Sequence, residues 1–105
     1  MQGRIEIKGA EVSVKIPIEL MRDGERVIVY THALDLCGYG NTAEEANKDF
    51  ESALKIFFRE TMGNNTLEKA LEELGWKKII IDNHRYWEPQ TEVISSSLQE
   101  MKFSA

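Results

Sequence analysis

His32, Asp35 and Cys37 are the one group of catalytic or metal-binding residue types that lie close together in the sequence. An imidazole, a carboxylate and a thiol could form a ligand set or a Cys-His nucleophile pair. One cysteine and two histidines cannot supply the paired dyads of a zinc signature. Because lone cysteines are usually small core residues, we interpret the group as a strand-end histidine, a turn aspartate and a buried thiol.

The acidic residues are numerous, but most have a structural explanation. A two-metal nuclease needs several carboxylates that converge from different strands. Asp23 is explained by a turn, and Glu44, Glu45 and Glu68 by helix starts. No surplus set remains, so we expect no catalytic residues, no metal and no cofactor. A residual metal-dependent nuclease is the least favoured functional hypothesis.

Composition and charge narrow the class of protein. The chain has 105 residues, 42% of them hydrophobic, and a formal net charge of -5. These values are typical of one folded domain. The excess of acidic residues argues against direct binding of this chain to nucleic acid, because it repels the phosphate backbone. No apolar stretch is long enough to cross a membrane or to serve as a signal peptide. We expect a cytoplasmic protein without membrane contact.

Period-two alternation predicts a strand over residues 12–20, because every second residue there is aliphatic. Pro17 lies on the opposite face and lacks an amide hydrogen, so this strand should lie at a sheet edge or carry a bulge. The aliphatic face contains Val12, Val14, Ile16, Ile18 and Leu20.

A tight turn at Asp23-Gly24 predicts a hairpin between this strand and a second one over residues 26–31. We expect the aliphatic face of the hairpin to be the core, whereas a longer loop would shift the register. With a two-residue loop at Asp23-Gly24, the pairs on the core face are Leu20 with Val27, Ile18 with Val29 and Ile16 with Thr31.

Capping and turn residues divide the rest of the chain into further elements. In chain order, these are a short strand over 36–39, a helix from the Thr42/Glu45 capping box to Gly63, a shorter helix from Thr66 to Gly75, a strand over 79–81, a turn at 83–85 and a short extended piece over 86–88. Residues 91–103 fit either helix or strand, with strand favoured, and the first ten residues contain a possible short strand.

The fold class predicted from these elements is α+β, in the order β-β-β-α-α-β. We expect one antiparallel sheet of three to five strands with the helices packed on one face. The predicted domain spans residues 11–82, with an N-terminal extension over 1–10 and a C-terminal, extended segment over 83–105.

This order of elements resembles the HicB-like antitoxin domain family over roughly residues 12–78. The order and spacing of four segments carry the resemblance: Val27 to Tyr30, Leu34 to Cys37, Gly40 to Ala46 and Leu71 to Trp76. The resemblance implies a degraded RNase H-like domain without nuclease activity. It also implies a role as an antitoxin that binds a small basic RNase toxin of the HicA type.

Two further expectations concern partners. Family members that repress their own operon carry a C-terminal DNA-binding module, for which residues 79–105 are too few. The predicted helical layer over residues 43–75 has a net charge of -4 and would attract a basic partner.

The back of the predicted hairpin is where we expect a partner or a second copy, through Pro17, Ile28, Tyr30 and His32. The alternative to an antitoxin-like role is an orphan scaffold that forms homo-oligomers, as a dimer or larger, and whose ligand, if it binds one, is unknown.

Overall fold

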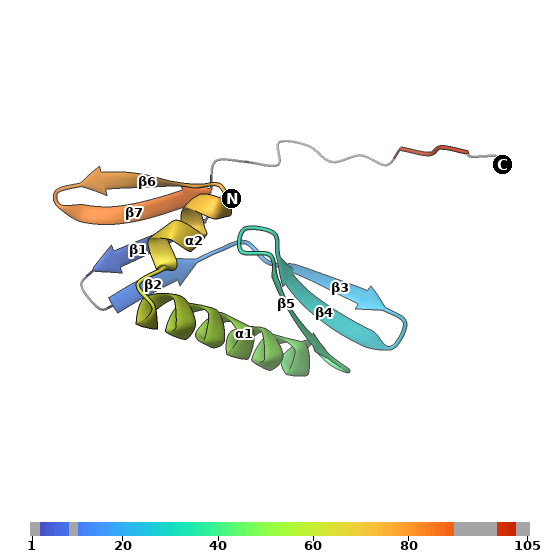
Figure 1. Cartoon of the computed structure of the whole chain (residues 1–105). Coiled ribbons are helices and arrows are strands. Elements are labelled where there is room, and N and C mark those ends of the chain that lie inside the picture. The colour runs from blue at the N-terminus through green and yellow to red at the C-terminus, as the bar shows by residue number, and fades with distance from the viewer. Residues whose placement is uncertain (1–2, 9–10, 90–98, 103–105) are drawn as a thin grey trace.

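The computed structural model describes residues 3–8, 11–89 and 99–102, which contain seven strands and two helices (Figure 1). The predicted α+β class is confirmed, but there are two antiparallel sheets, ordered β2-β1-β7-β6 and β3-β4-β5, where one was expected. No helix in these ranges is long and apolar enough to cross a membrane. The elements are β1 (Arg4–Lys8), β2 (Glu11–Lys15), β3 (Glu19–Asp23), β4 (Arg26–Thr31), β5 (Leu36–Gly40), α1 (Ala43–Gly63), α2 (Leu67–Glu73), β6 (Trp76–Ile81) and β7 (His84–Pro89).

The single strand predicted over residues 12–20 is wrong, because the chain changes sheet at Pro17. Residues 16–18 form no strand and connect β2 in the four-stranded sheet to β3 in the three-stranded sheet. Proline has no amide hydrogen to donate to a ladder. Its carbonyl oxygen accepts a hydrogen bond from Thr31 Oγ1 at 2.9 Å, which holds the crossing point against the end of β4.

The β3–β4 hairpin forms, but its predicted register is wrong by two residues. Asp23 pairs with Arg26, so the turn is Gly24-Glu25, and Leu20 lies opposite Val29. Gly24 has a φ of 63°, which suits the first position of a type II′ turn. A slip of two residues keeps each side chain on its predicted face, and Val29 is fully buried.

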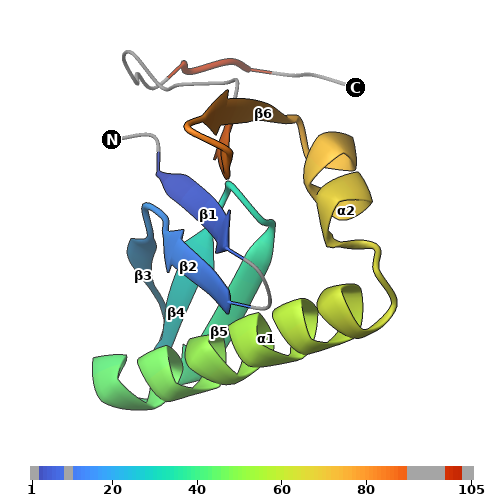
Figure 2. The same ribbon diagram turned by 90° about the vertical axis from the view of Figure 1, so that its left-hand side faces the viewer.

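Leu20 and Ile18 are 61% and 50% exposed, although both were expected in the core. The reason is the position of α1, which packs on β5 and β4 and leaves β3 uncovered (Figure 2).

Helix α1 connects the two sheets by packing its two halves on different clusters of buried residues. Near its N-terminus, Ala46 and Phe50 pack with Val27 and Val29 of β4. Nearer its C-terminus, half-buried side chains of α1 pack against a second cluster of buried residues, which includes residues of the four-stranded sheet. That cluster contains Ile5, Ile7, Leu34, Leu67, Leu71, Trp76 and Trp87. At 1.5 Å per residue the 21-residue helix is about 30 Å long, enough to span both sheets.

The ends of the helices follow the predicted capping chemistry in part. Thr42 Oγ1 accepts the amide of Glu45 at 3.1 Å, as predicted, whereas Glu45 Oε2 accepts the amide of Asn41 at 2.8 Å, one residue before the cap. Thr66, the predicted start of α2, makes no capping hydrogen bond with its side chain. Gly75, with a φ of 90°, ends α2 as predicted. Gly63 is still helical, and the left-handed residue after α1 is Asn65, with a φ of 57°.

Two segments outside the predicted domain form the inner strands of the four-stranded sheet. The predicted strand in the first ten residues is β1, which pairs with both β2 and β7. The turn predicted at residues 83–85 lies one residue earlier, at Asp82-Asn83, and both turn residues have positive φ. His84 and Arg85 therefore belong to β7. The strand favoured over residues 91–103 lies largely outside the described residues.

Two glycines let α1 approach β5 closely. A Cβ added to Gly38 would lie 2.3 Å from the amide nitrogen of Phe50, and one added to Gly40 would lie 2.6 Å from that of Ala46. Real Cβ atoms do not approach backbone so closely, so any larger residue would push the helix off the sheet.

We expect Gly38→Ala to lower the free energy of unfolding by about 3 kcal/mol, because the new methyl group meets rigid helix backbone. Urea denaturation followed by circular dichroism measures this loss. Gly63→Ala is the matched control, since nothing lies within 4 Å of its added Cβ. The control should be neutral or stabilising by up to about 1 kcal/mol. Equal stability of the two variants would contradict the close packing of α1 on β5.

Candidate functional site

The turn between β4 and β5 contains the cluster that could do chemistry, and its side chains contact tyrosines. Asp35, with a φ of 52°, accepts a hydrogen bond from Tyr30 Oη at 3.0 Å. The Cys37 thiol lies 3.1 Å from Tyr39 Oη, and the His32 ring centroid is 6.5 Å from that of Tyr30. Within the described ranges, no three His, Cys, Asp or Glu side chains are grouped as a metal site would need.

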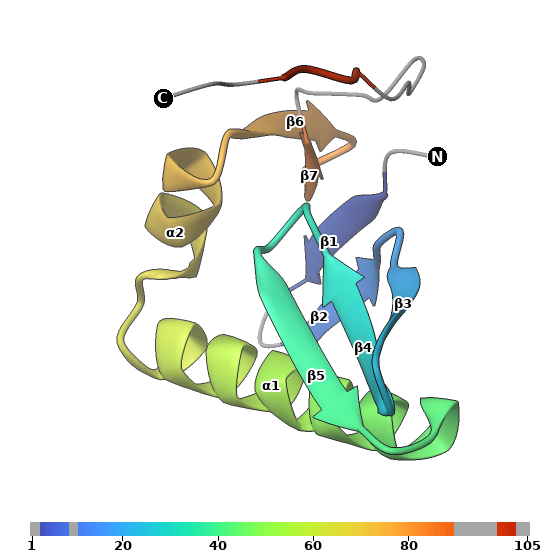
Figure 3. The same cartoon turned by 90° about the vertical axis from the view of Figure 1, so that its right-hand side faces the viewer.

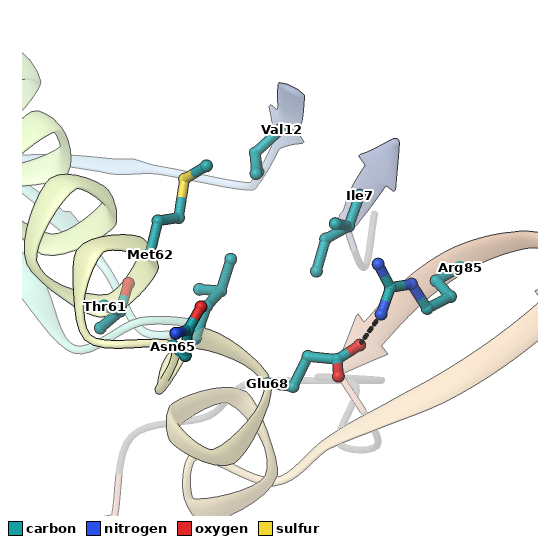
Figure 4. A pocket seen from close by; sticks show the side chains of 8 residues that line it. Ile7, Val12, Thr61, Met62, Asn65, Glu68 and Arg85 are labelled. Atoms are coloured by element: carbon teal, nitrogen blue, oxygen red, sulfur yellow. Dashed lines mark hydrogen bonds and ion pairs between the residues drawn. The ribbon is translucent and has the colours of Figure 1, made fainter. Parts of the chain in front are cut away.

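A cavity of about 400 Å³ lies between the β1–β2 hairpin, the end of α1 and α2 (Figure 4). Its polar wall includes Glu68, whose Oε1 lies 3.3 Å from Arg85 Nη1 and 3.7 Å from Lys78 Nζ. These ion pairs tie α2 to β6 and β7. Thr61 in the same wall donates its hydroxyl to the Phe57 carbonyl at 2.7 Å. The polar groups hold neighbouring elements together, and we interpret the cavity as a gap between them.

The side of the three-stranded sheet that faces away from α1 is a more promising surface, and we name it the outer face. It consists of Met21, Ile28, Tyr30, Cys37 and Tyr39. Figure 3 shows this side, with β4 and β5 in front of α1. Met21 and Tyr39 are 41% and 45% exposed, and the other three are half-buried. It is an aromatic and sulfur-containing surface on a rigid sheet.

Hydrogen bonds and one cation hold the tyrosines of the outer face in place. The hydrogen bond to the Asp35 carboxylate raises the pKa of Tyr30 above its ordinary value. The contact with the Cys37 thiol raises the pKa of Tyr39 in the same direction. The guanidinium of Arg26 lies 4.8 Å from the centroid of the Tyr39 ring, at cation-π distance. Both phenols are therefore neutral at physiological pH.

The charges around the outer face are mainly negative. Glu19 and Asp23 alternate with Met21 on the same side of β3, and Asp35 lies at the end beyond Tyr30. Arg26, next to Asp23, is the opposing cation. Three carboxylates against one guanidinium leave this surface suited to a basic partner.

The predicted interface residues are only partly brought together. Ile28 and Tyr30 are half-buried on the outer face, and the exposed His32 lies beside Tyr30. Pro17 is exposed in the connection between the sheets. The sequence interpretation missed Met21 and Tyr39. Its prediction of a buried thiol at Cys37 is wrong, because Cys37 lies half-buried on the outer face of β5. Alternation in β5 could have found Cys37 and Tyr39, because they face away from Gly38 and Gly40.

Comparisons with protein-family models, with curated proteins and with solved structures found no match for this chain.

The Tyr30–Asp35 contact predicts a specific pH effect. Asp35→Asn should lower the pKa of Tyr30 toward its ordinary value, because the anionic acceptor is replaced by a neutral amide; asparagine also tolerates the positive φ. A raised tyrosine pKa stabilises the fold at pH below the unfolded-state pKa, and this contribution disappears as pH rises through the folded-state pKa. Titration of ¹³Cζ-labelled tyrosine by NMR measures the change.

Asp49→Asn is the control for this titration. Asp49 acts on Tyr39 and is not among the groups that shift Tyr30, so the Tyr30 titration should be the same as in the original chain. An unchanged Tyr30 pKa in Asp35→Asn would show that the hydrogen bond does not form in solution.

Proposed function

We propose that this chain is a non-catalytic protein-binding domain that captures a small basic protein on its outer face, in the manner of an antitoxin. The observation that carries the proposal is the uncovered surface of two tyrosines, an isoleucine and a methionine on β3, β4 and β5. Tyrosine and methionine are enriched at protein interfaces, and tyrosine is a frequent hot-spot residue.

The outer face is also preorganised for binding. Tyr30 is held by Asp35, and Tyr39 lies between Cys37 and Arg26, so little side-chain freedom is lost when a partner binds. The sheet beneath is fixed by the close approach of α1 at Gly38. Rigid aromatic side chains on a rigid sheet favour protein recognition.

The class of partner follows from charge and from the resemblance. The carboxylates of Glu19, Asp23 and Asp35 surround the outer face, and the whole chain has a net charge of -5. The resemblance to HicB-like antitoxins suggests a basic RNase toxin of the HicA type. A basic protein would be attracted by these charges at long range and held by the aromatic centre at contact.

The test is co-expression of this chain with the reading frame for a small basic protein beside its gene. We expect a complex in which Tyr30→Glu raises the Kd about 30-fold or more, because the variant puts a charge at the centre of the interface. Isothermal titration calorimetry measures the Kd, and raising the salt concentration should also weaken binding.

Tyr86→Glu is the matched control, because Tyr86 is a half-buried strand tyrosine in the other sheet. It makes the same change in charge away from the outer face and should bind like the original chain. If Tyr86→Glu weakens binding as much as Tyr30→Glu, the partner does not bind on the outer face. If the original chain does not bind the basic protein, the antitoxin-like role is wrong.

A further inference from the structure

The two edges of the three-stranded sheet differ in how their backbone groups are covered. At the β5 edge, two carboxylates of α1 accept backbone amides: Asp49 Oδ2 accepts that of Tyr39, and Glu45 Oε2 accepts that of Asn41, directly after the strand, both at 2.8 Å. An amide that is already bonded cannot pair with another strand. The C-terminal end of the β5 edge is therefore partly covered.

The opposite edge, β3, is open in the described part of the chain. Asp23 and Arg26 flank a two-residue turn and so exchange hydrogen bonds, and alternation then directs the backbone groups of Leu20 and Arg22 away from β4. No side chain within the described ranges bonds to them. Every residue of β3 is exposed.

Apolar side chains are also concentrated at this edge. Ile18, Leu20 and Met21 are large, apolar and at least 41% exposed, and they lie within four consecutive residues. A groove of about 450 Å³ runs from Leu20, Met21 and Arg22 to the start of α1. Of the devices by which natural proteins protect edges, β3 contains charged residues but no lysine, proline or bulge.

We propose that a second copy of this chain pairs with β3 edge to edge, in antiparallel orientation, and joins two three-stranded sheets into one of six strands. The proposal concerns the β3 edge and does not depend on binding at the outer face. The α1 helices of the two copies would lie on the same side of the joined sheet, and the two outer faces would be continuous on the other.

The charges of β3 select the register of this pairing. In an antiparallel pair of identical strands with two-fold symmetry, one residue lies at the centre and faces the same residue of the second copy. Centring on Glu19, Arg22 or Asp23 places two like charges in direct opposition, and centring on Met21 places Glu19 opposite Asp23 twice. Centring on Leu20 opposes no like charges. Leu20 then meets the second copy's Leu20. Pairing that continues one residue beyond β3 places Ile18, the last residue of the connection, opposite the second copy's Arg22.

A second copy fits this edge because β3 can lie opposite itself in this register without opposing like charges. The register brings the most exposed leucine of β3 against its own equivalent and buries part of both side chains. Few residues are paired, so we expect a weak dimer whose mass changes with concentration.

The test compares two variants of the same exposed residue, Ile18→Glu and Ile18→Lys. Sedimentation equilibrium measures the dimer Kd of each. In the Leu20-centred register, Ile18→Glu creates two ion pairs with Arg22, whereas Ile18→Lys creates two like-charge pairs. We expect the Kd of Ile18→Lys to be about tenfold higher than that of Ile18→Glu. Repulsion between the net charges of the two copies predicts the opposite, a higher Kd for Ile18→Glu. The reason is that the chain already has a net charge of -5 and the glutamate adds to it.

Ile80→Lys is the control, because Ile80 is 64% exposed on β6, an edge strand of the other sheet. Its dimer Kd should equal that of the original chain, and circular dichroism should show all variants folded. A chain that remains monomeric up to about 1 mM overturns the proposal. If Ile80→Lys dissociates the dimer, the copies do not pair through β3. If the two Ile18 variants have equal dimer Kd values, the Leu20-centred register is wrong.

Discussion

The close approach of α1 to β5 is the contact on which the rest of the structure depends. The backbone of the helix lies where Gly38 and Gly40 would otherwise carry side chains, so Ala46 and Phe50 reach the buried valines of β4. Because the helix is long enough to extend past β5, its other half covers the second cluster of buried residues and holds the two sheets together. A bulkier residue at Gly38 would disturb both clusters through one helix.

The same contact decides which surfaces remain free. Helix α1 covers one side of β4 and β5, which leaves the outer face on the other side, with Tyr30 half-buried and Tyr39 exposed. It also stops short of β3, which leaves Leu20 in solvent although its alternation is that of a core residue. The same helix places the carboxylates of Glu45 and Asp49 where they accept the amides of Asn41 and Tyr39 at the C-terminal end of the β5 edge. The outer face and the β3 edge are thus two separate surfaces that one packing arrangement leaves uncovered by helix α1.

Much of the chain followed local chemistry that a sequence displays. The capping box at Thr42, the stop at Gly75 and the strand formers of β4 and β6 led to the right elements, because backbone capping and strand preference act over a few residues. The hairpin between β3 and β4 was also predicted with the right faces. Its register was not, because Asp23-Gly24 and Gly24-Glu25 are both acceptable turns and the choice between them depends on how β4 packs.

The sequence by itself determined the α+β class, both helices and which side of β4 is buried, since period and capping are local properties. Only the tertiary structure decided that the chain changes sheet at Pro17, that β1 and β7 lie at the centre of a sheet, and that Met21, Cys37 and Tyr39 share a surface with Tyr30. The physical reason is that alternation shows which face of a strand is apolar but not which strands a helix will reach, so Leu20 of β3 is 61% exposed although Val29 of β4 is buried. Which strands meet depends on contacts between residues far apart in the chain, such as Ile5 with Trp87, and no local pattern contains them.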